Sequence, residues 1–332
     1  TTTWTSDPCG RSFYDNGDNN ALIVDAAYSW NDAAWIRPAR GKLVVYELQI
    51  KDFTRGDSGY TYNTGEQENY LGMIAKIPYL TALGVNAVEI MPIQEWPGGW
   101  YSWGYNNSGF FAPENSLATD GHASDASAYN EFKQLVDALH QAGISVILDV
   151  VYNHAANDNN SLWAIDSSYY FDPAGTPWGN KIEMRNPGVQ KFFLDNLKYW
   201  MDEFHVDGFR FDSTENIDGG SLRSLIKLLK DNGYADRYFI FEEFSSANAD
   251  IRTFNTTEGG QYISSWGTGF KYAIWGAVNN GWDGNLGKIT YYSKDDGWNH
   301  PHEVINYFSS HDEGNLSAAR KDGRRAATKA EV

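Results

Sequence analysis

Four short segments of this 332-residue chain combine an apolar run with carboxylates, often with a histidine or arginine beside them. They are Asp149–His154, Gly208–Asp212, Phe239–Glu243 and Phe308–Asp312. An apolar run predicts a buried strand. An unpaired buried carboxylate is costly, so these acids should lie where a sheet opens to solvent or ligand. Four such strand ends predict one site at the carboxyl ends of several strands, as in (β/α)8 barrel enzymes.

Two acids of this set could hold opposite protonation states. Arg210 and Asp212 are two residues apart, so they point the same way at the end of a strand. A cation beside an acid keeps that acid ionised, and an ionised carboxylate can be a nucleophile. The alternative is an ordinary structural ion pair. Glu242 is expected to face the barrel lumen and Glu243 to point away, and a carboxyl group among apolar residues can donate a proton.

Two carboxyl groups of opposite protonation are what glycoside cleavage requires, at about 5–5.5 Å in retaining enzymes. Asp212 and Glu242 come from adjacent predicted strands, so that spacing is reachable. The alternative for either glutamate of the fifth strand is pairing with a cation from a loop. His311 and Asp312 end the seventh predicted strand and can bind a polar ligand, and His154 ends the third.

Strands and helices must alternate to position these ends. The apolar runs predict seven strands, at 43–50, 87–93, 146–151, 206–212, 238–242, 262–266 and 304–309. Helical spacing predicts helices at 70–83, where Pro78 favours a late kink or an early stop, and at 131–142, 189–204, 221–230 and 270–278. The alternation predicts the α/β class and a (β/α)8 TIM-type barrel. The eighth βα unit is expected to be lacking.

The predicted organisation is a lead-in or linker over residues 1–40 and a catalytic barrel over 41–332. Two long loops, 94–125 and 155–187, leave the carboxyl ends of strands, and loops of this length tend to be functional. The first contains aromatic residues that could form a sugar-binding rim, which are Trp96, Trp100, Tyr101, Trp103 and Tyr105.

Composition excludes several classes of function. The net charge of −17 argues against nucleic acid or an anionic membrane as partner, and it favours a neutral substrate. The single cysteine, Cys9, excludes a disulfide within the chain and a cysteine-based zinc site. No apolar stretch approaches the roughly 18 residues that a membrane span needs.

Together, the four segments resemble the four signature regions of the alpha-amylase family, glycoside hydrolase family 13. The resemblance covers residues from about 43 to 320, in the right order. The stretch Trp103–Asn106 resembles the family's segment with the aromatic that stacks on the sugar at the cleavage point. The lead-in, from Asp7 through Trp30, resembles the join after an N-terminal carbohydrate-binding β-sandwich in isoamylase-like and branching-type members.

The resemblance implies a role for each site residue. Asp212 would be the nucleophile, Glu242 the acid/base and Asp312 the stabiliser of the transition state. Arg210 would hold Asp212, while Tyr105, His154 and His311 would bind the sugar. Asp149 and Asn153 match positions that support the site. The family's C-terminal β domain is expected to be lacking, like the eighth βα unit.

Two positions depart from the pattern of many alpha-amylases. Glu215 and Asn216 stand where those enzymes carry Lys-His, a pair that serves sugar binding and the calcium site. No cofactor is expected for the chemistry. Calcium remains an open expectation, with Asn153 as its candidate ligand.

The resulting expectation is a retaining hydrolase of α-1,4 or α-1,6 bonds in starch- or glycogen-like α-glucans. One alternative is a glucan-branching or other α-glucan transferase, since Glu242–Ser245 resembles the branching-enzyme form of the third region. A second alternative is a barrel that only binds glucan. Secretion or a periplasmic location is expected for a hydrolase and a cytoplasmic one for a branching-type enzyme. The oligomeric state is left open.

Overall fold

The computed structural model describes most of the chain between residues 27 and 312. The described residues are 3–4, 23–24, 27–57, 59–63, 66–97, 103–119, 127–157, 160–244, 248–260, 262–280, 298–307 and 309–312. The chain divides into two compact units, Thr1–Tyr238 and Phe239–Val332. Within the described ranges, none of the helices has the length and apolar character that crossing a membrane would require.

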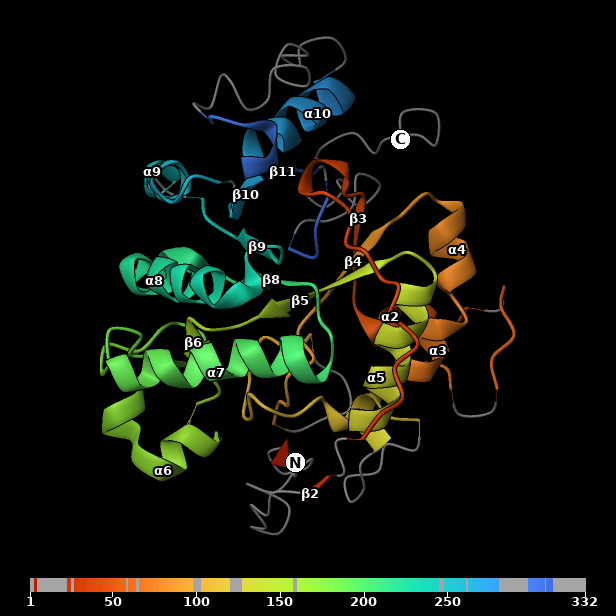
Figure 1. The fold of residues 1–332 in the computed structure, drawn as a ribbon, viewed down its shortest axis with the longest axis horizontal. Helices are drawn as coiled ribbons and strands as arrows, with labels where there is room; N and C mark the ends of the chain where they lie inside the picture. Colours follow the sequence, from red (N-terminus) through yellow and green to blue (C-terminus); the bar gives the residue numbers. More distant parts are fainter. Residues whose placement is uncertain are drawn as a thin grey trace. The chain divides into compact units, whose positions relative to one another are not determined.

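The first unit is built on four parallel strands (Figure 1), in the order β3 (Val45–Leu48), β4 (Ala87–Ile90), β5 (Ser145–Val150) and β8 (Gly208–Phe211). Every residue of β4, β5 and β8 is buried. This burial is typical of parallel strands whose faces are both covered, and it explains their continuous apolar runs.

Helices follow these strands along the chain (Figure 1). They are α2 (Ile50–Thr54), α3 (Tyr70–Ile74), α4 (Ile77–Ala82), α5 (Ser127–Gln141), α6 (Ser161–Tyr170), α7 (Pro187–Glu203) and α8 (Gly219–Leu229). Short helical turns lie at η1 (Arg40–Lys42), η2 (Asn115–Leu117), η3 (Thr214–Asn216) and η4 (Lys230–Tyr234). Two-residue strands form the pairs β1 (Thr3–Trp4) with β2 (Ile23–Val24) and β6 (His154–Ala155) with β7 (Asn180–Lys181).

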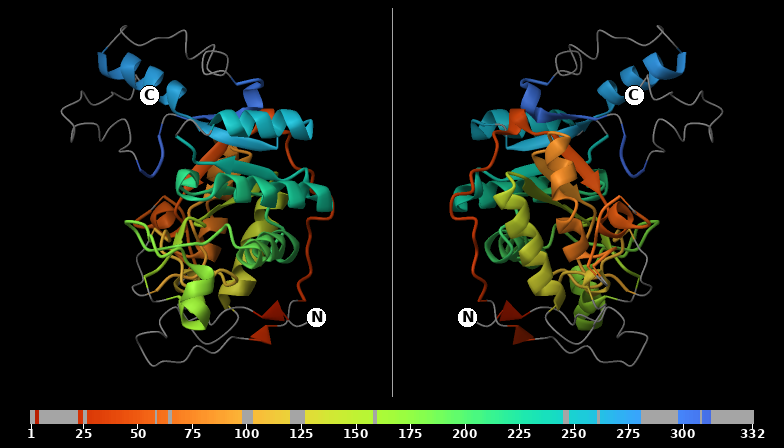
Figure 2. Two further views of the ribbon diagram at one scale, coloured as in Figure 1. Left: turned by 90° about the vertical axis from the view of Figure 1, so that its left-hand side faces the viewer. Right: turned by 90° about the vertical axis from the view of Figure 1, so that its right-hand side faces the viewer.

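The second unit carries β9 (Tyr238–Phe241), whose first residue belongs to the first unit, and β10 (Ile263–Gly267) and β11 (Val304–Asn306). These strands are parallel and pair in that order. Their helices are α9 (Asn248–Glu258), α10 (Thr268–Asn280) and the turn η6 (Pro301–Glu303) (Figure 2). The Asn255 side chain ties α9 to β10 through bonds of 2.8 and 3.0 Å to the backbone of Ile263.

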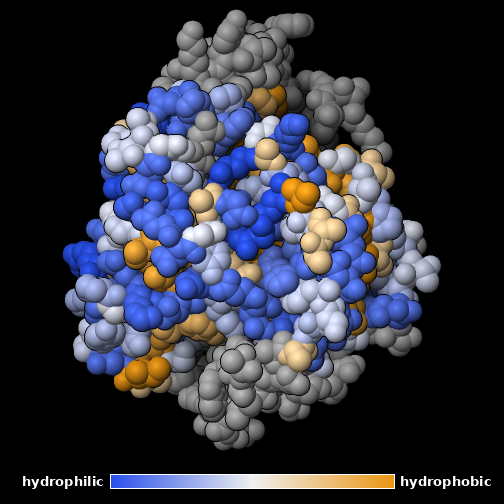
Figure 3. Space-filling model, in the orientation of Figure 1, coloured by the Kyte–Doolittle hydropathy of each residue, from blue (hydrophilic) through white to orange (hydrophobic). Residues whose placement is uncertain are grey.

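All seven predicted strands are observed, and the alternation of parallel strands with helices confirms the α/β, TIM-type barrel class. The predicted inward faces of α5 and α8 are buried as well. Their buried residues include Phe132, Leu135, Val136 and Leu139, and Leu222, Leu225, Ile226 and Leu229. Most of the described residues visible in Figure 3 are hydrophilic, which agrees with an acidic, water-exposed surface.

One predicted helix is wrong in its extent. Residues 70–83 form two helices, α3 and α4, which the chain separates at Ala75 and Lys76. Pro78 lies in the first turn of α4, where a missing backbone N–H costs no hydrogen bond. The proline therefore begins a helix and does not end one. The helix α9 was not predicted, because Asn248–Glu258 has a weak apolar pattern with few buried residues.

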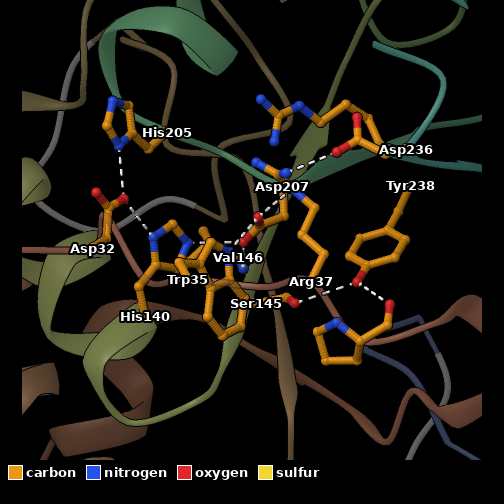
Figure 4. A network of polar contacts seen from close by, with 12 residues as sticks. Asp32, Trp35, Arg37, His140, Ser145, Val146, His205, Asp207, Asp236 and Tyr238 are labelled. Carbon is orange, nitrogen blue, oxygen red and sulfur yellow. Dashed lines mark hydrogen bonds and ion pairs between the residues drawn. The ribbon is translucent and has the colours of Figure 1, made fainter.

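A buried carboxylate connects the lead-in to the barrel (Figure 4). Asp207 precedes β8 and is 0% exposed. It accepts hydrogen bonds from Val146 N at 2.8 Å and from Trp35 Nε1 at 2.9 Å, and it lies 2.6 Å from Arg37 Nε. Because a buried charge must be paired, the lead-in residues Trp35 and Arg37 compensate a charge inside the barrel.

His140, in the last turn of α5, connects Asp207 to Asp32. Its Nε2 lies 2.9 Å from Asp207 Oδ2 and its Nδ1 lies 2.9 Å from Asp32 Oδ2. His205 Nδ1 lies 2.7 Å from the same oxygen of Asp32. Burial alone would raise the pKa of Asp32, but the hydrogen bonds with His205 and His140 together outweigh it and hold that pKa below its usual value. We call this set the lead-in cluster, which consists of Asp32, Trp35, Arg37, His140, His205 and Asp207.

Candidate active site

The register between β5 and β8 places an acidic and a basic side chain on neighbouring strands, side by side. Asp149 pairs directly with Arg210 across the two strands. Arg210 Nη1 lies 2.9 Å from both carboxylate oxygens of Asp149 and 2.9 Å from Asp212 Oδ1. Arg210 is 0% exposed and Asp149 is 1% exposed. Such deeply buried charges require close pairing, so this ion pair holds the guanidinium against Asp212.

Asp212 is held at both of its carboxylate oxygens. Oδ1 accepts from Arg210, and Oδ2 accepts from Asn153 Nδ2 at 2.6 Å. The same Asn153 nitrogen donates to the backbone oxygen of Asp212 at 2.9 Å, and Asp212 N donates to Val150 O at 3.0 Å. The side chain is still 15% exposed. A carboxylate that is fixed in direction and accessible has the geometry that a nucleophile needs.

The chain turns sharply directly after Asp212. Ser213 has φ 41° and ψ 57°, in the left-handed region that residues other than glycine rarely adopt. Asn216 Nδ2 donates to Ser213 Oγ at 2.7 Å, within the turn η3. Backbone strain of this kind costs roughly 1–3 kcal/mol and is concentrated at functional sites. The turn ends the strand at the point where Asp212 emerges.

Tyr105 approaches the same acids from the first long loop. Its hydroxyl donates to Asp149 Oδ2. Burial, together with the Asp149 carboxylate, raises the pKa of Tyr105 far above its usual value, so the phenol stays protonated and remains a donor. Gly104 makes the approach possible, since its φ is +89° and a Cβ there would lie 2.2 Å from Pro92 O.

His154 connects Tyr105 to Asn153. Its Nε2 lies 3.0 Å from the backbone oxygen of Tyr105, and its Nδ1 contacts Asn153 Oδ1. Burial lowers the pKa of His154 below its usual value, although the nearby Asp212 acts in the opposite direction. The ring is therefore a hydrogen-bonding group beside the candidate nucleophile, and its contact with sugar stays a prediction.

The structure changes the predicted aromatic rim. Trp96 is 3% exposed, and its backbone N donates to Glu114 Oε2 at 3.1 Å, so this residue packs inside the loop and was wrongly placed on a rim. Trp103 is 45% exposed. Tyr105 is half-buried against Asp149. Trp100 and Tyr101 lie outside the described residues.

The remaining predicted residues belong to the second unit. Glu242 and Glu243 are each 4% exposed, so their burial does not show which of the two faces the barrel lumen. The lumen-facing role of Glu242 stays a prediction. The backbone oxygen of Glu243 accepts from Ser265 Oγ at 3.3 Å. His311 Nε2 lies 3.4 Å from Asp312 Oδ1, with side chains 8% and 58% exposed.

The Asn153 amide is engaged by neighbouring side chains. Its nitrogen donates to Asp212, and its oxygen faces His154 Nδ1. Among the described residues, no three or more His, Cys, Asp or Glu side chains are grouped so that they could hold a metal ion. The expectation of calcium stays a prediction.

Three features of this site were not predicted from the sequence. Asn153 was expected to support the site or bind metal, but its two bonds to Asp212, which come from the bend after β5, were not foreseen. The left-handed Ser213 has no signal in its residue type. The third is Trp178, which lies in a Thr-Pro-Trp-Gly turn near His154. Its proline and glycine were a turn signal inside the second long loop.

Comparisons with known proteins identify similar chains. The family model "Alpha amylase, catalytic domain" matches residues 50–168. A malto-oligosyltrehalose trehalohydrolase from Saccharolobus solfataricus is 33% identical over 276 residues, which are 81% of this chain and 44% of that protein. Isoamylase 3, chloroplastic, from Oryza sativa subsp. japonica is 38% identical over 199 residues, which are 51% of this chain and 25% of that protein. The chain thus spans less than half the length of these relatives.

Solved structures show the same fold. A type I pullulanase from Bacillus subtilis, complexed with maltose, superposes with a TM-score of 0.73 at 24% identity. The match covers 88% of this chain and 47% of that one. A pullulanase from Anoxybacillus, complexed with maltotetraose, gives a TM-score of 0.72 at 24% identity, with 88% and 48% covered.

Proposed function

Because this chain belongs to the alpha-amylase family, glycoside hydrolase family 13, we propose that it cleaves α-1,4 or α-1,6 glucosidic bonds of starch- or glycogen-like α-glucans with retention of configuration. The observation that carries this proposal is the Asp212 carboxylate, whose two oxygens are fixed by Arg210 and Asn153 at the end of β8. In this arrangement the Asp212 carboxylate can act as a nucleophile toward a neutral sugar.

In the proposed first step, a carboxylate oxygen of Asp212 attacks the anomeric carbon while Glu242 donates its proton to the departing glycosidic oxygen. A glycosyl-enzyme ester forms. In the second step, Glu242 removes a proton from water, and this water hydrolyses the ester and frees Asp212. Asp312 stabilises the positive charge that develops on the sugar, His154 and His311 bind its hydroxyl groups, and the Tyr105 ring stacks on it. No cofactor takes part.

This mechanism requires the carboxyl groups of Asp212 and Glu242 to lie about 5–5.5 Å apart. A crystal structure with a bound maltooligosaccharide would measure that separation. A value of about 6.5–9.5 Å would indicate inversion instead.

The likeness to relatives named isoamylase and trehalohydrolase supports a glycoside hydrolase acting on α-glucan. The fold neighbours were solved with maltose and maltotetraose, which supports a maltooligosaccharide as the ligand. A branching-type transferase would use the same glycosyl-enzyme ester, with a sugar hydroxyl in place of water. We propose a secreted or periplasmic location for a hydrolase, because polymeric glucan is usually met outside the cell.

The proposed function is tested by Asp212→Asn. Incubation with starch, pullulan and glycogen, followed by reducing-end assay and product sizing, should show cleavage by the wild type. The variant should lose roughly 10⁴-fold or more in kcat, as nucleophile loss does in covalent catalysis. The control is Asp202→Asn at the exposed end of α7, whose carboxylate accepts from Tyr234.

Full activity of Asp212→Asn would contradict the nucleophile assignment. Release of shorter chains without new reducing ends would favour the transferase. Retained glucan binding with no turnover in the wild type would favour the binding barrel.

A further inference from the structure

A rigid turn holds a tryptophan beside the candidate active site. Thr176 N donates to Gly179 O at 3.0 Å, while Trp178 N and Gly179 N donate to Thr176 Oγ1 at 3.2 and 3.0 Å. These bonds close the segment Thr176–Gly179 on itself. The backbone that carries the Trp178 indole is therefore fixed before any ligand arrives.

The turn is also fixed against the strand that carries His154. In the β6–β7 pair, His154 opposes Lys181 and Ala155 opposes Asn180. A Cβ on Gly179 would lie 2.1 Å from Ala155 O and 2.9 Å from His154 Cδ2, so only glycine allows this approach. The position of Trp178 relative to His154 is thus set by backbone contacts.

The Trp178 ring lies close to the imidazole and is open to solvent. Its centroid is 6.0 Å from that of His154, with 39° between the ring planes, and the residue is 53% exposed. The imidazole in turn reaches Tyr105 and Asn153, which contact Asp149 and Asp212. Tryptophan is enriched at binding interfaces, because its indole combines a large flat apolar surface with a polar N–H.

We propose that Trp178 is a binding platform for a glucose unit of the α-glucan chain, adjacent to the unit held at Asp212 and His154. The inference rests on the proposed function and extends it to chain binding. One face of a pyranose ring is mainly C–H, and it can bury against a flat indole. A fixed aromatic loses little conformational entropy on binding, so this contact contributes to affinity. The acidic chain, with a net charge of −17, suits a neutral glucan.

The test is binding of maltoheptaose, measured by isothermal titration calorimetry on the intact protein. Asp212→Asn is the parent, so that turnover does not interfere. In this background, Trp178→Ala should weaken the affinity about tenfold, which corresponds to about 1.4 kcal/mol, and Trp178→Phe should retain most of it. Gly179→Ala should also weaken binding, because it displaces the turn while keeping the indole.

The matched control is Trp163→Ala. Trp163 lies on α6, is 38% exposed, and its ring is 5.8 Å from that of Phe171. Its removal should leave the affinity unchanged. Circular dichroism and the unfolding midpoint verify that each variant is folded.

The platform would be overturned if Trp178→Ala bound maltoheptaose as tightly as the parent does. It would also be overturned if Trp163→Ala and Trp178→Ala lost the same amount of affinity, or if the parent did not bind maltoheptaose. These results are separate from those for the proposed function. If the wild type binds maltoheptaose through Trp178 but cleaves no glucan, the platform stands and the hydrolase proposal fails. If the wild type cleaves glucan and Trp178→Ala leaves the affinity unchanged, the hydrolase proposal stands and the platform fails.

Discussion

At the scale of single residues, the site is organised around the direction of one carboxylate. Arg210 binds one oxygen of Asp212 and Asn153 binds the other. Arg210 is itself fixed by Asp149, which also accepts from the Tyr105 hydroxyl. A substitution at any of these positions should thus act on catalysis through Asp212, even where the residue never contacts sugar.

Asn153→Ala should lower kcat with little change in KM. A hydrogen bond to a charged group contributes roughly 1.5–3 kcal/mol, and each 1.4 kcal/mol is tenfold in rate, so the loss should be about ten- to hundredfold. Asn153→Asp should be more damaging, because a second carboxylate would face Asp212 Oδ2. Steady-state kinetics on a soluble maltooligosaccharide measures both variants.

The control for this pair is Asn232→Ala, whose exposed amide donates to Leu228 O at 2.7 Å. An Asn153→Ala enzyme with the wild-type kcat would show that Asn153 does not position the nucleophile.

Residue types predicted the Arg210–Asp212 pair, because residues two apart on a strand share a face. They could not predict the bonds from Asn153, since that residue lies beyond the end of β5 where the two-residue period stops. Trp96 illustrates the opposite error. Its residue type fits a sugar-binding rim equally well, and only the fold of the loop decides that it is buried.

At the scale of elements, local chemistry fixes where helices begin. Asn186 caps α7, because its Oδ1 accepts from Gly188 N at 2.9 Å and its Nδ2 donates to Tyr169 O at 3.1 Å. The cap therefore joins α7 to the end of α6. Pro187 follows as the first helical residue, a position that tolerates proline.

Asn186→Ala should destabilise the protein by roughly 0.5–2 kcal/mol, as loss of an N-cap does. Asn186→Asp should cost less, since it keeps the oxygen that caps α7 and loses only the donor to α6. Urea denaturation measures both values. A cost for the aspartate variant equal to that of the alanine variant would assign the stabilisation to the Tyr169 contact instead.

Element types were largely predictable, and element ends were less so. The strands were found because both faces are buried, which leaves continuous apolar runs. The break at Ala75 and Lys76 was misplaced, because a proline was taken as an end signal when it also suits a helix start. The β6–β7 pair was missed, since two residues are too few to show a period.

At the scale of the whole molecule, charge pairing joins the lead-in residues Asp32, Trp35 and Arg37 to the folded first unit. Asp207 is buried before β8, and its partners Trp35 and Arg37 come from the segment that the sequence predicted to be a lead-in or linker. Sequence patterns could not reveal this, because the partners are separated by about 170 residues, with Trp35 and Asp207 being 172 apart.

The lead-in cluster predicts a loss of stability in acid. The pKa of Asp32 is lower in the folded protein than its usual value, so this carboxylate adds stability at pH above about 4. The contribution is lost as the pH falls through the folded pKa. Asp32→Asn should therefore be less stable than the wild type at pH 6, and the difference should shrink below about pH 4.

Urea denaturation at several pH values between 3 and 6 measures this difference. Asp236→Asn, at the exposed partner of Arg37, is the control, because its side chain is 59% exposed and should contribute little. A difference between wild type and Asp32→Asn that stays constant across this range would contradict the role of Asp32.

The lead-in cluster also constrains how such chains can diversify. Asp32, His140 and Asp207 come from three distant parts of the sequence, yet each satisfies a charge or a ring nitrogen of another. A recombination event that exchanges the segment before the barrel would separate Asp32 from His140, and it would remove Trp35 and Arg37 from the buried Asp207. The three positions should therefore be inherited as a set, and natural chimaeras of this family should have their crossover points on either side of the set.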